Sequence, residues 1–158
     1  MKNLKAKDIM NYNVLAVGLD WSVEQLADYL LENSISGAPV TSEDRKLLGV
    51  VSLTDIVRYK SLPGTDAHPD NPHEYYIHVP DREYSQSDIE SFSIDAESLV
   101  IIRDIMTHKT YTVSENTSIK EVADAMIRGG IHRVFVTRED MLIGIITTMD
   151  ILKVVRDL

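Results

Sequence analysis

The sequence contains no cysteine, which excludes disulfides, zinc–thiolate sites and a cysteine nucleophile. It has no apolar run near the ~18 residues that a membrane-spanning helix needs, and its first ten residues, MKNLKAKDIM, lack the apolar stretch of a signal peptide. Basic residues are outnumbered: 16 Lys and Arg face 25 Asp and Glu, giving a net charge of −9. Proteins that grip nucleic acid present basic surfaces. These absences predict a cytoplasmic protein with no membrane or nucleic-acid partner.

What the sequence does contain is one unit written twice. The matching segments are KDIM (7–10) with RDIM (103–106), WSVEQLADYLLENSIS (21–36) with TSIKEVADAMIRGGIH (117–132), and GVVSLTDI (49–56) with GIITTMDI (144–151). Between residues 8–44 and 104–140, 12 of 37 positions are identical at a constant offset of 96. Most other pairs exchange similar residues, so the match indicates an internal repeat and not chance.

Each unit has the pattern of β-α-β-β-α secondary structure. Its first helix begins with a capping box, Ser22 with Gln25 in one copy and Ser118 with Glu121 in the other, and apolar residues follow at helical spacing. The apolar, β-branched run before each final helix is typical of a buried strand. A unit of ~55 residues buries too little surface to be stable alone. We therefore predict an α+β fold in which two units pack sheet to sheet about a pseudo-twofold axis.

The repeat divides the chain into a first domain (1–60), an inserted segment (61–97) and a second domain (98–158). The insert holds four of the five prolines and is rich in Asp and Ser, which is loop composition. Within it, SQSDIESFSI could form a short helix, while Tyr75, Tyr76, Ile77 and Phe92 indicate that the insert packs against the body of the protein or within a dimer interface.

Three histidines, His68, His73 and His78, recur every five residues in the insert. Pro69 and Pro72 break any helix there, so these histidines do not share the face of one helix that a metal site would use. We expect them to be exposed, and we predict no metal site.

The end of each unit places small hydroxyls and a carboxylate at the start of a helix. Ser52 and Thr147 end a strand, where hydroxyls, free N–H groups and the helix dipole suit a phosphate, and Thr54 adds a hydroxyl in the first unit. Asp55 and Asp150 lie in the first helical turn, outside the expected core, where a carboxylate can accept hydrogen bonds from ribose hydroxyls. The alternative is that these residues only cap their helices.

A second set of polar residues precedes the middle strand of each unit. His132 and Arg133 begin the second unit's strand, and both are natural counter-charges for phosphate. The first unit has Ser36 in the matching place, so we predict that the second unit binds an anion more strongly than the first. Alternatively, Arg133 pairs with a surface carboxylate such as Glu139.

The repeat, the DIM motif that opens each copy, the HRVFV strand and the G-h-h-S/T-x-x-D ending (h, apolar) resemble a tandem pair of CBS domains, the Bateman module. The resemblance covers residues 4–60 and 99–158. It implies two CBS folds packed through their sheets, a homodimer, and AMP, ADP, ATP or S-adenosylmethionine in the clefts between the units. Met149, where the first unit has Thr54, departs from the pattern.

The resemblance also implies roles for individual residues. The ribose would be held by Asp55 and Asp150, and phosphate would be met by Ser52, Thr54, Thr147, Ser36, His132 and Arg133. Adenine would lie near the first strand and the end of the first helix of each unit, where the candidates are Leu15, Ala16, Ile35, Tyr111, Thr112 and Ile131.

The function favoured by the sequence is a regulatory module that senses an adenosine nucleotide and acts on an unknown partner in trans. It would need no catalytic cofactor and would not be an enzyme, because no motif supplies a base–nucleophile pair. The alternatives are a ligand-free dimerisation scaffold and a nucleotide hydrolase.

Overall fold

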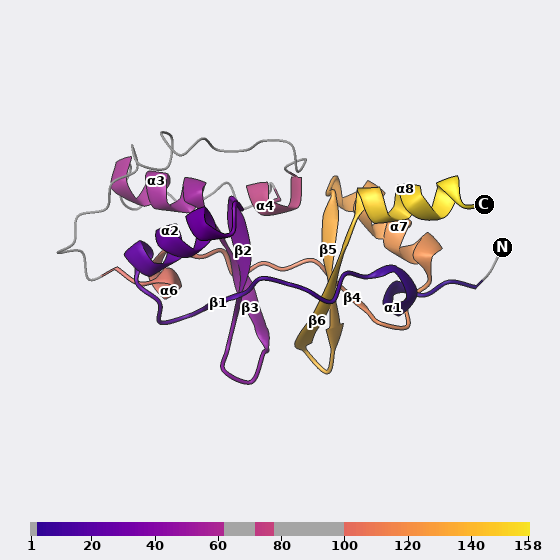
Figure 1. The fold of residues 1–158 in the computed structure, drawn as a ribbon, viewed down its shortest axis with the longest axis horizontal. Coiled ribbons are helices and arrows are strands. Elements are labelled where there is room, and N and C mark those ends of the chain that lie inside the picture. Colours follow the sequence, from indigo (N-terminus) through magenta and orange to yellow (C-terminus); the bar gives the residue numbers. More distant parts are fainter. Residues whose placement is uncertain (1–2, 62–71, 78–99) are drawn as a thin grey trace.

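Two similar units lie side by side in the computed structural model, with their sheets toward the middle and most helices outside (Figure 1). The structure describes residues 3–61, 72–77 and 100–158. The elements of the first half are α1 (Ala6–Ile9), β1 (Val17–Gly18), α2 (Val23–Glu32), β2 (Gly37–Thr41), β3 (Leu47–Ser52), α3 (Leu53–Ser61) and α4 (Glu74–Ile77). Those of the second half are α6 (Ile102–Ile105), β4 (Thr112–Ser114), α7 (Ile119–Gly129), β5 (Arg133–Arg138), β6 (Met141–Thr147) and α8 (Thr148–Arg156).

Each unit is built on a three-stranded sheet. The strand order is β1-β2-β3 in the first unit and β4-β5-β6 in the second, with a parallel first pair and an antiparallel second pair in both. The helices α2 and α7 begin with the predicted capping boxes at Ser22 and Ser118. The predicted α+β repeat of β-α-β-β-α units is confirmed, with one short helix added before each copy.

The segment that leads into each unit packs on the other unit. Before and within α1, Leu4 and Ala6 exchange backbone hydrogen bonds with Ile119 and Thr117 of the second unit, at 3.0 and 2.8 Å. In the same way α6, which leads into the second unit, packs on the first unit, where the Ile102 N–H donates to the Trp21 carbonyl at 2.9 Å. This exchange ties the units together by backbone pairing as well as by side chains.

Two glycines allow the chain to cross between the units. After α6, Thr107 pairs with Val50 of β3 through two 2.9 Å backbone hydrogen bonds, and a side chain at Gly49 would collide with the Thr107 carbonyl. The matching Gly144 of β6 leaves room for the Met10 side chain. Close backbone approach therefore requires glycine at position 49, whereas at position 144 a Cβ atom would collide with a side chain.

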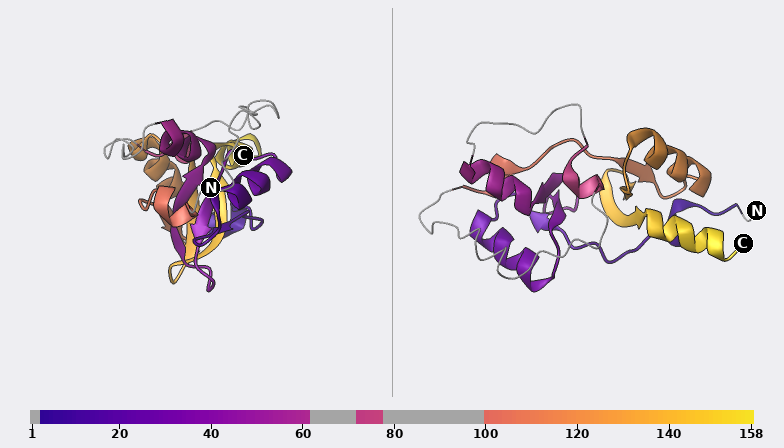
Figure 2. Two further views of the ribbon diagram at one scale, coloured as in Figure 1. Left: turned by 90° about the vertical axis from the view of Figure 1, so that its left-hand side faces the viewer. Right: turned by 90° about the horizontal axis from the view of Figure 1, so that it is seen from above.

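The two units have separate cores, and α4 extends the second one. The first core contains Leu26, Leu30, Val40 and Ile56. The second contains Val122, Phe135, Val136 and Ile146 together with Tyr75 and Tyr76 from α4. The prediction that the insert packs against the body of the protein is therefore confirmed for these two tyrosines. Seen from above, both termini lie at the end of the second unit (Figure 2).

None of the helices in the described part of the chain is both long and apolar enough to cross a bilayer.

Candidate functional site

The repeated hydroxyl–carboxylate motif has the same local geometry in both units. Asp55 Oδ2 accepts the Ser52 backbone N–H at 2.8 Å and lies 3.3 Å from the Ser52 hydroxyl. Asp150 Oδ2 accepts the N–H and the hydroxyl of Thr147, both at 2.9 Å. Each carboxylate thus caps the start of its own helix, α3 or α8, where the helix dipole favours negative charge. Capping is present, and it uses one oxygen of each carboxylate.

The second carboxylate oxygen meets a basic residue one helical turn further on. Asp55 Oδ1 accepts from Arg58 at 3.1 Å, and Asp150 Oδ1 accepts from Lys153 at 3.1 Å. Both basic residues stand three positions after the aspartate, so the repeat extends to this pair. Because each carboxylate has a basic side chain beside it, the start of each helix carries less net negative charge than the aspartate alone would give.

The two carboxylates differ in exposure. The Asp150 side chain is 18% exposed, whereas the Asp55 side chain is 2% exposed. The prediction that Asp55 lies outside the core is wrong, because α4 covers it. Thr54, the second hydroxyl of the first unit, is also covered and donates to Glu74 of α4 at 2.5 Å.

His73, just before α4, binds directly to Asp55. Its Nε2 lies 2.8 Å from Asp55 Oδ2, and its Nδ1 accepts the backbone N–H of Tyr75 at 3.0 Å. Since Nδ1 is an acceptor, the proton of the neutral ring sits on Nε2 and is donated to the carboxylate. The expectation of an exposed histidine is wrong here, because its side chain is 3% exposed. His68 and His78 lie outside the described residues.

Glu74 completes a small charged cluster. Besides accepting from Thr54, it lies 3.7 Å from Arg58, which also binds Asp55. Arg58 is therefore shared between the carboxylate at the start of α3 and the carboxylate of α4. The cluster holds α4 in place by charge as well as by packing.

Aromatic rings fix the other side of α4 to the second unit. Tyr75 stacks on Phe135 with ring centroids 5.7 Å apart and planes 13° apart, and Tyr76 meets Tyr111 edge to face at 4.8 Å. Tyr76 also uses its backbone, because its carbonyl accepts the His132 N–H at 2.7 Å. Burial raises the pKa of both the Tyr75 and the Tyr76 phenols above its ordinary value.

Arg133 faces α4. Its guanidinium lies 4.7 Å from the centre of the Tyr75 ring, a cation–π contact. The charge of Arg133 partly offsets the rise that burial causes in the pKa of Tyr75. Arg133 thus contacts the insert through the Tyr75 ring.

The other predicted polar residues flank the helix starts. The Ser36 carbonyl accepts the Leu53 N–H at the start of α3, and the His132 carbonyl accepts the Thr148 N–H at the start of α8, both at 2.9 Å. Ser36 is half-buried and His132 is exposed. The strand registers confirm the symmetry, since Gly37 pairs with Ser52 and Arg133 with Thr147.

The residues predicted to lie near adenine differ in their exposure to solvent. Ile131 is buried in the second core and Ile35 packs on the first, while Ala16 is half-buried and Thr112 is exposed. Leu15 is 41% exposed. Tyr111 is held against Tyr76 by the edge-to-face contact and by donating its N–H to the Tyr76 hydroxyl at 3.3 Å.

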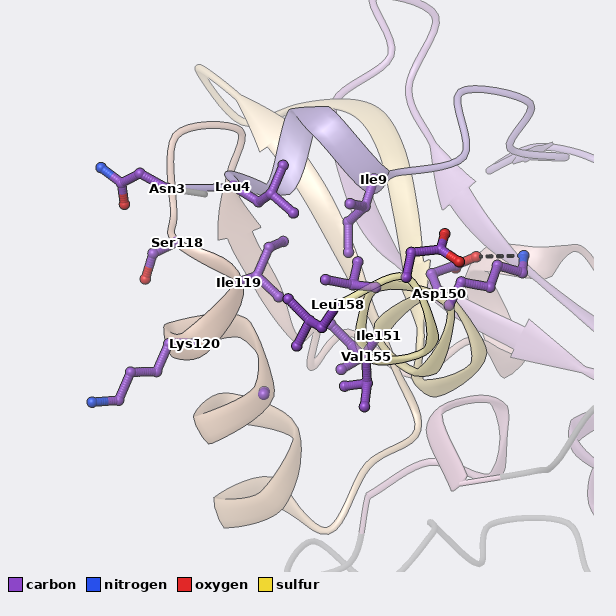
Figure 3. A pocket seen from close by; sticks show the side chains of 14 residues that line it. Asn3, Leu4, Ile9, Ser118, Ile119, Lys120, Asp150, Ile151, Val155 and Leu158 are labelled. Atoms are coloured by element: carbon purple, nitrogen blue, oxygen red, sulfur yellow. Dashed lines mark hydrogen bonds and ion pairs between the residues drawn. The ribbon is translucent and has the colours of Figure 1, made fainter. Parts of the chain in front are cut away.

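A cavity of about 970 Å³ opens beside Asp150, between the N-terminal segment, α7 and α8 (Figure 3). Its walls are largely apolar, with Ile119, Ile151 and Val155 among the residues labelled there. Asp150 stands at its edge in contact with Lys153. Within residues 3–61, 72–77 and 100–158, no three His, Asp or Glu side chains are grouped to bind a metal ion.

Sequence reasoning missed Arg58, His73 and Glu74. His73 and Glu74 lie in the insert, which has no counterpart in the repeat, so no symmetry pointed to them. The available signal was the string HEYYI, an aromatic pair beside charged residues within a proline-rich segment. For Arg58 the signal was Lys153 at the equivalent position of the second unit.

Comparisons with known proteins agree with the fold and with its repeat. The family model described as CBS domain matches residues 6–62 and 102–157. The uncharacterized protein MJ1426 of Methanocaldococcus jannaschii is 31% identical over 151 residues, which cover 93% of this chain and 88% of that protein. Among solved structures, CBSX2 in complex with AMP has a TM-score of 0.65 at 21% identity, covering 97% of this chain and 96% of that one. The CBS domain pair of MJ0100, in complex with 5-methylthioadenosine and S-adenosyl-L-methionine, has a TM-score of 0.59 at 21% identity, covering 98% and 97%.

Proposed function

Because the chain belongs to the CBS domain family and carries two copies of the domain, we propose that it is a regulatory module that binds an adenosine nucleotide between its two units. The candidate ligands are AMP, ADP, ATP and S-adenosylmethionine. The observation that carries the proposal is the same hydroxyl–carboxylate arrangement at the start of α3 and of α8. The AMP, methylthioadenosine and S-adenosylmethionine complexes of CBSX2 and the MJ0100 domain pair support it.

The second unit offers the more accessible half of the site. Asp150 keeps part of its carboxylate exposed, and among the described residues its Oδ1 is engaged by Lys153, which is itself 61% exposed. A ribose diol can replace that lysine, because an ionised carboxylate accepts several hydrogen bonds. The Thr147 hydroxyl and the start of α8 then face the phosphate, with His132 and Arg133 as nearby counter-charges.

The site suits binding more than catalysis. His73 has both ring nitrogens engaged, one by Asp55 and one by a backbone N–H, so it is not available as a general base. We propose that the protein is not an enzyme and that no catalytic cofactor is required. Ligand would act by favouring one arrangement of the units, which requires different affinity for two arrangements. A partner protein in trans would read that change.

Exposed apolar side chains on and just after α8 support a homodimer. Met149, Leu152 and Val155 of α8 and Leu158 beyond its end are each more than half exposed, and Ile127 of α7 is 78% exposed. An apolar face of this kind commonly marks a protein–protein contact. We propose that a second copy of the chain covers it. Light scattering on Leu152→Glu should then report a monomer where the unmodified protein is a dimer, and a monomer in both would refute this assembly.

Thermal unfolding with AMP, ADP, ATP or S-adenosylmethionine tests the binding function. A ligand at 100 times its dissociation constant stabilises by ~2.7 kcal/mol, which raises the melting temperature by ~5–10 °C in a chain of this size. Shifts with none of the four would favour the ligand-free scaffold. Incubation with ATP followed by product analysis tests the remaining alternative, a nucleotide hydrolase, because only a hydrolase would form product.

A further inference from the structure

The segment His73–Ile77 takes up the groups that a nucleotide would use in the cleft. His73 hydrogen-bonds to Asp55, Glu74 accepts from Thr54, and the Tyr76 carbonyl accepts the backbone N–H of His132. Carboxylate, hydroxyl and strand N–H are therefore all engaged by one stretch of the same chain.

Shape and charge follow the same pattern. The Tyr75 ring lies 5.7 Å from the Phe135 ring and 4.7 Å from the guanidinium of Arg133. Through this cation–π contact the segment occupies the guanidinium that the proposed function assigns to phosphate. The Tyr76 ring lies against Tyr111 and is fully buried. The segment thus places a hydrogen-bond donor at the carboxylate assigned to ribose and an aromatic ring on the guanidinium assigned to phosphate.

We propose that residues 73–77 are an internal competitor of the nucleotide, bound in the cleft on the Asp55 side and displaced when that side fills. This inference rests on the proposed nucleotide function and adds a form of regulation to it. The second unit's carboxylate has no such partner among the described residues, since Asp150 is engaged by Thr147 and Lys153 alone. The two halves of the repeat are accordingly unequal: Asp150 binds first, and Asp55 binds only after α4 leaves.

The competition has a measurable size. A site that is open for a fraction of the time has its apparent dissociation constant raised by the inverse of that fraction. Weakening the segment's hold should therefore tighten binding at the Asp55 side by tenfold or more, which corresponds to ~1.4 kcal/mol. Binding at the Asp150 side should change by less than about twofold by the same relation.

The experiment is calorimetric titration with AMP and with ATP of the unmodified chain, His73→Ala and Glu74→Gln. Glu74→Gln keeps size and removes charge from a half-buried residue, so it stays informative where His73→Ala fails to fold. Ile77→Ala is the matched control, because Ile77 belongs to the same helix but is 40% exposed. We expect one binding event in the unmodified chain and in the control. In the other two variants we expect a second event that Asp55→Asn removes.

Hydrogen exchange of the 73–77 amides gives an independent readout. At nucleotide concentrations well above those used in the titration, high enough to fill the weaker Asp55 side, the exchange of these amides should accelerate in the unmodified chain. Equal stoichiometry and affinity in all variants, with no change in exchange, would overturn the competition while leaving nucleotide binding intact. Absence of binding by every variant would instead overturn the proposed function on which the competition rests.

Discussion

Replacing the two equivalent aspartates by alanine should destabilise the protein unequally. In the absence of ligand, Asp55 accepts hydrogen bonds from Ser52, His73 and Arg58, and its side chain is 2% exposed. Asp150 makes the same cap, and its ionic partner within the described part of the chain is the exposed Lys153. The two copies share the hydroxyl–carboxylate cap, so we attribute most of the difference in stability to the contact with His73 before α4.

The magnitudes follow from those contacts. In both variants the lost helix cap costs ~1 kcal/mol. Asp150→Ala loses in addition an exposed ion pair worth ~0.2–1 kcal/mol. Asp55→Ala leaves the buried N–H of His73 without its acceptor, which costs a further ~1–3 kcal/mol. We expect ~2–4 kcal/mol for Asp55→Ala against ~1–2 kcal/mol for Asp150→Ala, from these values taken together.

Urea unfolding without nucleotide measures both free energies of unfolding. Asp20→Ala is the control, because the Asp20 side chain is 79% exposed and pairs only with an exposed arginine in the described structure. Its stability should stay within ~0.5 kcal/mol of the unmodified protein. A double variant, Asp55→Ala with His73→Ala, should cost less than the sum of its parts, since each removes the other's partner. Equal losses for the two aspartates, or strict additivity in the double variant, would refute the buried Asp55–His73 contact.

The remaining predictions concern packing and pH. Burial raises the pKa of Tyr75 and of Tyr76, so this part of the stability should be fully present below the ordinary tyrosine pKa of ~10 and lost as the pH rises above it. Tyrosinate absorbance and melting temperature, followed together across this range, measure the effect. A melting temperature that stays constant up to about pH 11.5 would contradict the prediction. Phe135→Ala removes a fully buried ring that both tyrosines contact, so we expect a loss of ~3–5 kcal/mol in urea unfolding, and a loss below 1 kcal/mol would be incompatible with this packing. Arg133→Ala should weaken ATP binding more than adenosine binding, because phosphate gains most from the guanidinium charge; equal losses in calorimetry would speak against a phosphate role.

The fold was predictable because its signals are local and occur twice. The capping boxes at Ser22 and Ser118, the apolar helix faces and the β-branched runs each specify an element from neighbouring residues. Repetition then confirmed each assignment with an independent copy. The sheet-to-sheet pairing followed from the small size of one unit, which is a general property of surface and volume.

Two features were beyond sequence reasoning, for physical reasons. The exchange of α1 and α6 between the units depends on backbone pairing between residues about 80 to 110 positions apart in the sequence, such as Ala6 with Thr117. Backbone pairing over such distances produces no periodic pattern in the sequence. The burial of Asp55 depends on α4, which lies in the segment without a repeat counterpart. At Asp55 and Asp150 equal motifs therefore have unequal surroundings, and only the structure distinguishes them.

The central claim is that an adenosine nucleotide binds between the units through the repeated carboxylates. The most direct test is calorimetric titration of the unmodified chain and of Asp150→Asn with AMP, ATP and S-adenosylmethionine, with folding checked by circular dichroism. We predict micromolar binding of at least one ligand and its loss or a drop of tenfold or more in Asp150→Asn, the loss of ~1.4 kcal/mol or more. Binding to neither protein, or equal binding to both, would contradict the account.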